Sequence, residues 1–513
     1  MKRRWKILIG LGILLVLLCA SLFVSLHVQP ANEVEAYKQL LRAKGEKLDW
    51  SELVTRPAAA EDNSADAVQK AFSMFDSGSE LMPYAMQMVG PGRALVGWQQ
   101  PDARNSDFTN SWEEYAAKVA ADRPTLALLG EVLQRPKLEF PWEQRNGCVS
   151  LISNLPDMRR AAQKLDATAI FELHSGHADA AATNILTILA LVQKNAAQGV
   201  EISHLVRLSM ANLAVATTWE LLQATNVADS PLATVEKAWQ QLDFLQDAEN
   251  SLTWERVWFS AQVVAARQSH AGFTNLFGDL MDTGSSGGGA GASWDWSDLL
   301  EDVTSGSRGA ISESLWRSSW SYESELNGLK TTQIRLETVR TMRTNRSGFY
   351  QADFDASTVR LGLLAPTNFG TTVFDVLKIP DLRRSFDDFS PNSMLRKTLQ
   401  AEAGRNVVIS AIALKRFQLK QGRLPDSLAE LAPDYLPAVP IDPYDGKPLK
   451  YHPNDDGTYL LYSVGDDGVD DGGDTSLSPG KIRSWYWQRG RDWVWPQPAS
   501  PAEVENFYAH PPK

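Results

Sequence analysis

The sequence predicts a mainly α-helical protein: an irregular helical bundle with a small α+β module at its C-terminal end and one N-terminal transmembrane helix. Three observations predict this fold. Apolar residues recur at helical spacing over 151–246 and again over 393–421. A short strand-like segment followed by an acidic loop occupies 458–474. Residues 7–28 form an apolar run without a formal charge.

The composition excludes some classes of function. The chain has 513 residues, with 62 acidic against 50 basic side chains and a net charge of −12. Outside the first six residues it has no basic block, so we expect no nucleic-acid partner. The two cysteines, Cys19 and Cys148, offer no disulfide within the body and no cysteine-based structural zinc site.

Residues 1–30 predict a cytoplasmic basic flank and a transmembrane anchor. The run 7–28 is long enough to cross a bilayer with slight tilt. A cleaved signal peptide is the alternative, although no good small-x-small cleavage site follows the run. The basic flank favours a cytoplasmic N-terminus, and therefore a bacterial inner-membrane protein with a periplasmic or extracellular body. That flank consists of Lys2, Arg3, Arg4 and Lys6.

Residues 31–282 predict a helical domain, clearest over 151–246. The pattern splits at 174–177 into two helices, and a second pair is expected over 201–223 and 231–247. An irregular bundle is favoured over a true solenoid, because a solenoid normally needs three or more repeats. Five residues of the first pair have a spacing typical of a tetratricopeptide-like hairpin: Phe171, Gly176, Ala181, Ile185 and Ile188.

Residues 283–297 form a Gly/Ser-rich segment that predicts a flexible loop. A phosphate-binding Gly-rich loop is the alternative, but the Lys-Ser/Thr pair that such a loop needs is missing. Residues 298–390 predict a helical continuation and a connection to the C-terminal module. Within them Trp316 and Trp320 are four residues apart, on one face of a helix.

Residues 391–495 predict the α+β module. Its long helix ends at Gly422, which favours a left-handed stop, and Pro425 cannot continue it. Trp485, Trp487, Trp493 and Trp495 alternate with period two, which predicts a hairpin turning at 488–491. These rings either cover the small sheet, which we favour, or form an exposed platform for a glycan or an envelope protein. Residues 496–513 are Pro-rich and predict a frayed tail.

The stretch from Asp455 to Asp474 holds seven aspartates and no basic residue. Carboxylates gathered in one place repel one another unless water or a cation separates them, and Ca²⁺ accepts six to eight oxygen ligands. The spacing is not that of an EF-hand, which needs a glutamate at its twelfth position. The stretch therefore predicts either a calcium site or a solvated acidic turn.

A series of turn, proline and aspartate positions follows the long helix within residues 393–474: Gly422, Pro425, Leu428, Leu431, Tyr435, Leu436, Pro440, Asp442, Pro443, Ser463, Gly465, Asp467 and Gly468. This order resembles the C-terminal half of the major (G-type) pseudopilin of type II secretion systems. In that family a long helix leads through a turn to a small antiparallel sheet and a calcium loop. The resemblance implies a pilin-like module and a calcium ion bound by Asp467 and the backbone carbonyl of Val464, with Asp470, Asp471 and Asp474 as candidate later ligands.

The N-terminus departs from that family. A pseudopilin begins with a short leader and the sequence Gly-Phe-Thr-Leu-Ile-Glu, and neither stands here. We therefore expect a pilin-type module that another protein carries at its end. The whole chain resembles uncharacterised single-pass envelope proteins with such a tail, a resemblance that implies no activity.

No catalytic motif stands out. The sequence contains neither a Gly-x-Ser-x-Gly elbow nor a His-Glu-x-x-His pair. His174 and His177 could reach one metal, but an exposed hairpin turn is favoured, and His204 predicts a hydrogen-bonded core histidine. Four charged residues could form a buried acid–base cluster, although nothing in their spacing joins them: Glu255, Arg256, Glu323 and Glu325.

Two functions follow as hypotheses. The first is a non-enzymatic envelope scaffold that touches secretion or pilus-like machinery, with calcium stiffening its C-terminal loop. The second is a hydrolase or other enzyme whose site lies among the helices. A deep pocket lined by polar groups with perturbed pKa values would favour the enzyme. A flat exposed apolar or aromatic patch would favour the scaffold.

Overall fold

The computed structural model describes residues 14, 28–53, 58–75, 85–104, 109–140, 154–194, 199–276, 310, 313–345, 347–364, 393–477 and 487–510. They are mainly helical, as predicted, with three small sheets. The chain divides into two compact units. The first comprises Met1–Thr55, Leu252–Leu336 and Thr358–Ser393, and the second comprises Arg56–Ser251, Glu337–Ser357 and Met394–Lys513.

Several predicted segments lie outside the described residues. They include the Gly/Ser-rich loop 283–297, both cysteines and most of the predicted anchor 7–28. No helix among the residues that the structure describes has the length and hydrophobicity of a bilayer span. The structure therefore gives no support to the predicted transmembrane helix.

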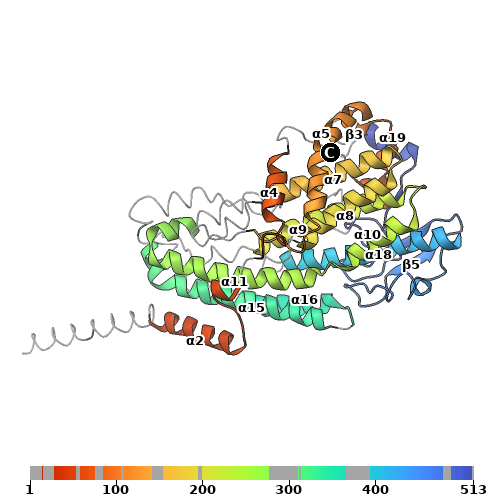
Figure 1. Cartoon of the computed structure of the whole chain (residues 1–513). Coiled ribbons are helices and arrows are strands. Elements are labelled where there is room, and N and C mark those ends of the chain that lie inside the picture. Colours follow the sequence, from red (N-terminus) through yellow and green to blue (C-terminus); the bar gives the residue numbers. More distant parts are fainter. Residues whose placement is uncertain are drawn as a thin grey trace, which may run out of the picture. The chain divides into compact units, whose positions relative to one another are not determined.

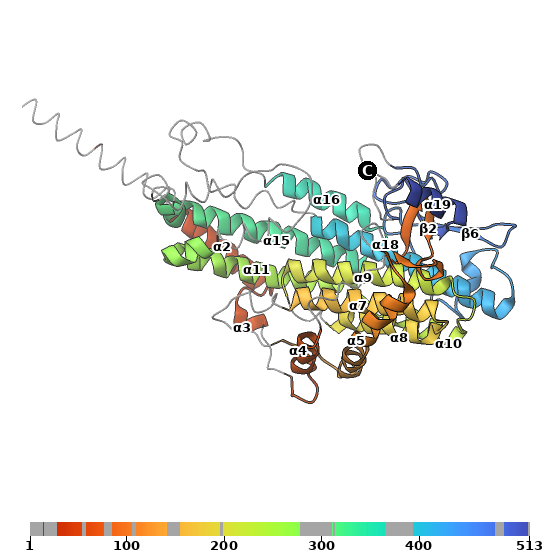
Figure 2. The ribbon, with the colours of Figure 1, turned by 90° about the horizontal axis from the view of Figure 1, so that it is seen from above.

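The first unit is built around three long helices, α2 (Gln29–Ala43), α11 (Phe244–Gln268) and α15 (Ser321–Thr344). The last two also contribute residues to the second unit. Figures 1 and 2 show α2, α11 and α15 running beside one another. At Gly328 a Cβ atom would lie 2.1 Å from Cε1 of Phe259, so this glycine permits α15 to approach α11.

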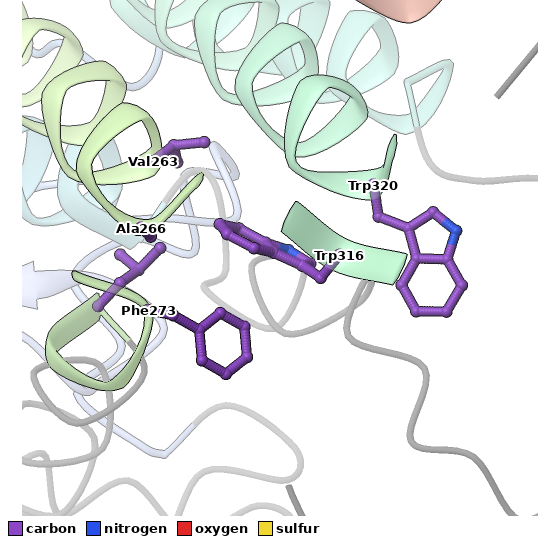
Figure 3. Close-up of a cluster of buried hydrophobic side chains, with 6 residues drawn as sticks. Val263, Ala266, Phe273, Trp316 and Trp320 are labelled. Atoms are coloured by element: carbon purple, nitrogen blue, oxygen red, sulfur yellow. The ribbon is translucent and has the colours of Figure 1, made fainter. Parts of the chain in front are cut away.

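A π-helical turn leads into α15. It spans Trp316–Trp320 (η3) and places both tryptophans in one buried cluster with residues of α11 (Figure 3). The indoles are 0% and 5% exposed. π-Helices are rare and occur mostly as single turns of this kind within α-helices. The first unit also contains the short helix α3 (Trp50–Leu53) and the end of α16 (Tyr350–Gly362).

The second unit is a helical bundle in which α7 (Leu155–His174), α8 (Ala178–Lys194) and α9 (Glu201–Leu222) lie side by side (Figures 1 and 2). The predicted split between α7 and α8 is confirmed, and Gly176 has the left-handed φ of +81° that the turn requires. The second predicted pair is also present, as α9 and α10 (Asp229–Gln240). Two further helices complete the N-terminal part of the bundle: α4 (Ala65–Ser73) and α5 (Trp112–Val132).

The predicted C-terminal module also belongs to the second unit. Its helix α18 (Ser393–Gln421) is buried along most of its length, and Gly422 follows with a φ of +70°. The 3₁₀ turn η5 (Leu428–Leu431) comes next. A three-stranded antiparallel sheet then follows in the order β5 (Lys450–Pro453), β6 (Tyr459–Ser463) and β7 (Trp493–Val494). The helix, the turn and strand β6 are confirmed.

One arm of the predicted tryptophan hairpin lies outside the described residues, which omit 485 and 486. The other arm forms strand β7, which pairs with β6 and opposes Val494 to Tyr462. The segment just before β7 runs back along the end of the acidic loop, where Gly490 forms an isolated antiparallel bridge with Leu477. The alternation of tryptophans predicted strand β7. It could not identify the partner strand β6, which lies about thirty residues earlier in the chain.

The C-terminal tail is ordered over the described residues up to 510, contrary to the prediction of a frayed segment. Strand β8 (Gln497–Pro498) adds parallel to β2 (Arg93–Leu95), which pairs antiparallel with β1 (Gln87–Gly90). Helix α19 (Pro501–Ala509) follows, with a capping box between Ser500 and Glu503. A 3₁₀ turn η2 (Gly97–Gln99) and the strand pair β3 (Ala103–Arg104) and β4 (Thr109–Asn110) lie beyond β2.

Candidate functional site

The acidic loop follows β6, and its residues differ in burial. Val464 is fully buried and donates its backbone N–H to Oδ2 of Asp442 at 2.8 Å. The four predicted aspartate ligands are all exposed. Oδ1 of Asp467 accepts the backbone N–H of Val469 at 3.0 Å, a local turn that needs no metal.

Asp470 is held by residues of the neighbouring strands. Its Oδ1 accepts the hydroxyl of Tyr462 at 2.9 Å, and its Oδ2 lies 3.4 Å from Nζ of Lys450. That same ammonium lies 3.3 Å from Oδ2 of Asp445. Partial burial acts in the opposite direction, but the bond from Tyr462 and the charge of Lys450 hold the pKa of Asp470 below its usual range.

Asp471 and Asp474 share a second cation, Arg491, which comes from the segment before β7. Its Nη1 lies 3.5 Å from Oδ1 of Asp471, and its Nε lies 3.7 Å from Oδ2 of Asp474. Asp474 also accepts the backbone N–H and the hydroxyl of Ser476, at 2.9 and 2.8 Å. These two bonds and Arg491 lower the pKa of Asp474.

Two buried aspartates organise the loop. Asp492 accepts backbone N–H groups of Asp471, Gly473 and Asp474, the shortest at 2.7 Å. Asp442 accepts from Ser463, Val464 and Tyr444, and so joins the proline-rich segment to the start of the loop.

Both carboxyls are inaccessible to solvent, and burial raises the pKa of Asp442 to about 6 and that of Asp492 above its usual value. Sequence reasoning noticed Asp442 only as a motif position and missed Asp492, which lies outside the acidic stretch.

The predicted ligands do not converge as a calcium site requires. No group of three His, Cys, Asp or Glu side chains within the described ranges is placed to hold a metal ion. The oxygens of Asp470, Asp471 and Asp474 instead receive hydrogen bonds or face the cations of Lys450 and Arg491. Because Ca²⁺ needs six to eight oxygens around one point, the donor set in this arrangement does not fit the ion.

The histidines occupy separate environments. Nδ1 of His174 lies 2.9 Å from the carbonyl of Trp98, and its ring stacks on Trp112 at 3.9 Å. His177 lies 3.0 Å from the carboxylate of Glu172. The two therefore mark a hydrogen-bonded hairpin turn, as favoured. His204 is fully buried, with Nε2 2.9 Å from the hydroxyl of Thr398, so the prediction of a core histidine is confirmed.

In the first unit, charged side chains are buried as two separate networks. Glu325 contacts Lys38 and lies 2.7 Å from Nη2 of Arg267. Glu46, Arg256 and Gln333 close a triangle with hydrogen bonds of 2.9 to 3.0 Å. Of the four charged residues considered from sequence, to which no role was assigned, Arg256 and Glu325 are buried with different partners. Of the other two, Glu255 is half-buried and Glu323 is exposed.

The second unit contains the carboxyls with the most strongly raised pKa values. Burial raises the pKa of Glu220 to about 8 and those of Asp166 and Asp247 to about 7. Glu220 accepts the backbone N–H groups of Met86 and Gly97 at 2.9 and 3.1 Å, which fixes the ends of the β1–β2 hairpin on α9. Each of these bonds is a packing contact, and no sequence motif could have indicated them.

Residues of the first unit line two of the surface cavities. One of about 510 Å³ is lined by residues of α11 and of the segment around η3: Arg267, Ala310, Glu313, Ser314, Arg317 and Ser318. Its charged groups bind one another, since Arg317 pairs with Glu313 at 3.2 Å and donates to the carbonyl of Arg267. The other, of about 200 Å³, lies between the start of α2 and α15.

The C-terminal tryptophans cover the small sheet. Trp487, Trp493 and Trp495 are 8%, 2% and 2% exposed, and the rings of Trp487 and Trp495 meet edge to face at 5.8 Å. The ring of Tyr444 meets Trp493 in the same way at 4.9 Å. The favoured packing role is confirmed for these three, and the exposed platform is wrong for them; Trp485 lies outside the described residues.

The polar groups described above therefore bind other groups of the same chain. They hold the acidic loop, the β1–β2 hairpin and the helices of the bundle in place. No known protein family, no characterised protein and no solved structure matches this chain.

Proposed function

We propose that this chain is a non-enzymatic scaffold of the bacterial cell envelope. Residues 7–28 anchor it in the inner membrane, its body lies in the periplasm or outside the cell, and it contacts envelope proteins of secretion or pilus-like machinery. The basic flank and the uncharged run support the anchor. The pseudopilin resemblance of residues 393–474 supports the kind of partner.

One observation favours the scaffold hypothesis over the enzyme hypothesis. The carboxyls with the most raised pKa values, such as Glu220 and Asp166, lie in the second unit and bind backbone or side-chain groups within its packing. The two cavities are lined by residues of the first unit. An acid–base site needs a perturbed group at the wall of a pocket, and neither Glu220 nor Asp166 lines these two cavities.

The hydrogen bonds between α18 and the helices of the bundle also support a rigid second unit. On α18, Glu402 accepts the backbone N–H of Phe244 at 3.1 Å, and Arg416 binds Asp229 and Glu236 of α10 at 2.8 and 2.9 Å. The pilin-like module therefore shares its long helix with the bundle. A module fused in this way presents a fixed surface to a partner.

In-cell cross-linking of the tagged full chain tests this function. The scaffold predicts that secretion or pilus-like envelope proteins are recovered with the wild type. It also predicts the same partners with Asp166→Asn and Glu220→Gln, since neither side chain reaches the surface. The proposal fails if no such protein is recovered while the purified chain hydrolyses an envelope substrate and either substitution abolishes that turnover.

A further inference from the structure

We propose that Lys450 and Arg491 hold the acidic loop in place of the calcium ion that the pseudopilin resemblance implies, so that the C-terminal module folds without a metal. The inference does not depend on the proposed scaffold function. It opposes the predicted calcium site directly, and the two make different predictions for the same titration.

The acidic loop concentrates negative charge. Within Asp466–Asp474 five carboxylates follow one another with no basic residue between them, so the loop needs positive charge from elsewhere. The fold supplies it from both sides. Lys450 comes from the first position of β5 and Arg491 from the segment before β7. Neither cation could be assigned to the loop from sequence spacing.

The two cations each lie near two carboxylates. Lys450 bridges Asp445 and Asp470 at 3.3 and 3.4 Å, and Arg491 bridges Asp471 and Asp474 at 3.5 and 3.7 Å. Each cation thus joins two carboxylates, as a metal ion would. Although burial acts in the opposite direction, the two carboxylates raise the pKa of Lys450, which keeps it charged.

Buried carboxylates of the protein bind backbone N–H groups of the loop. In a calcium loop the ion orders the chain, whereas here three residues of the loop, Asp471, Gly473 and Asp474, donate backbone N–H groups to the buried carboxylate of Asp492. Asp442 fixes the other end through Ser463 and Val464. The loop is therefore tied at both ends by protein groups. A divalent ion at Asp470 would also face the ammonium of Lys450, and like charges at that distance repel.

Calcium titration of the purified full chain in detergent tests the inference, with melting temperature and calorimetric heat as the two measurements. The wild type is expected to give the same melting temperature in EDTA and in calcium, and no saturable heat. The double variant Lys450→Gln/Arg491→Gln is expected to melt a few degrees lower in EDTA, about 2–4 °C for each kcal/mol lost, and to regain stability with calcium.

Lys447→Gln is the control for the loss of a positive charge, because Lys447 is exposed in the same segment; it removes one charge, and the double variant removes two. Saturable calcium binding by the wild type, lost in Asp467→Ala, would overturn the inference and restore the predicted site. So would a double variant as stable in EDTA as Lys447→Gln. Should the double variant fail to fold, the wild-type titration still decides between the two accounts.

Discussion

Replacing Glu220 by glutamine should remove a large pH dependence from the stability of the second unit. The side chain is fully buried, and its carboxyl accepts the N–H groups of Met86 and Gly97. Burial, reinforced by the charge of Asp166, raises its pKa from 4.5 to about 8. Glutamine keeps an acceptor for the hairpin and removes the titration.

The folded and unfolded chains bind different numbers of protons, and this difference sets the direction and size of the pH dependence of stability. Between pH 5 and pH 8 the folded chain keeps a proton on Glu220 that the unfolded chain has largely lost, so wild-type stability falls as the pH rises. With a folded pKa near 8 and about 1.4 kcal/mol per pKa unit, the wild type should lose about 3 kcal/mol more than Glu220→Gln over this range. The free energy of unfolding of Glu220→Gln, relative to that of the wild type, should therefore increase as the pH rises.

Urea unfolding at several pH values, followed by tryptophan fluorescence, measures this difference. Trp219 reports on the site, because it is adjacent in sequence, fully buried and bonded through Nε1 to the carbonyl of Pro496 at 2.8 Å. Glu131→Gln, at an exposed position of α5, is the control and should leave the wild-type pH profile unchanged. A constant stability difference between wild type and Glu220→Gln from pH 5 to pH 8 would refute the reasoning.

Two further substitutions test the packing. Arg256→Met leaves Glu46 buried without its cation, so the free energy of unfolding should fall by about 3–5 kcal/mol. Adding Glu46→Gln should recover part of that loss, and an equal loss in the double variant would contradict the pairing. Gly446→Ala combines a φ of +69° with a Cβ 2.6 Å from that of Phe349, whereas Gly457→Ala meets no atom within 4 Å at a φ of +81°. The first should lower the melting temperature clearly more than the second, which carries only the left-handed strain of about 1–2 kcal/mol; equal shifts would show that the contact costs nothing.

Much of the helical architecture could be predicted from sequence, because its signals are local. The break between α7 and α8 and the end of α18 both depend on a glycine with a left-handed φ, at Gly176 and Gly422. Strand β6 is a short run of tyrosines and leucines between turns. The signal for α19 was also present, since Ser500 and Glu503 form the Ser-x-x-Glu pattern of a capping box. The prediction missed it because it weighted the prolines.

The candidate site could be predicted only in part, because its contacts join residues far apart in the chain. The acidic loop itself was evident, but Lys450 lies on another strand and Asp492 follows the loop by some twenty residues. Burial decides their roles, and periodicity does not report the burial of a single polar side chain. Glu220 shows the same limit, because its partner Met86 is 134 residues away.

The proposed function depends most directly on the anchor, and a topology measurement tests it. In a Cys148→Ser background, Glu131→Cys places a reactive thiol at an exposed position of the body, which a membrane-impermeant maleimide can label in intact spheroplasts. The account predicts labelling without lysis and retention of the chain in carbonate-washed membranes, with retention lost when residues 1–28 are deleted. Labelling only after lysis, or a full-length chain in the soluble fraction, would contradict it.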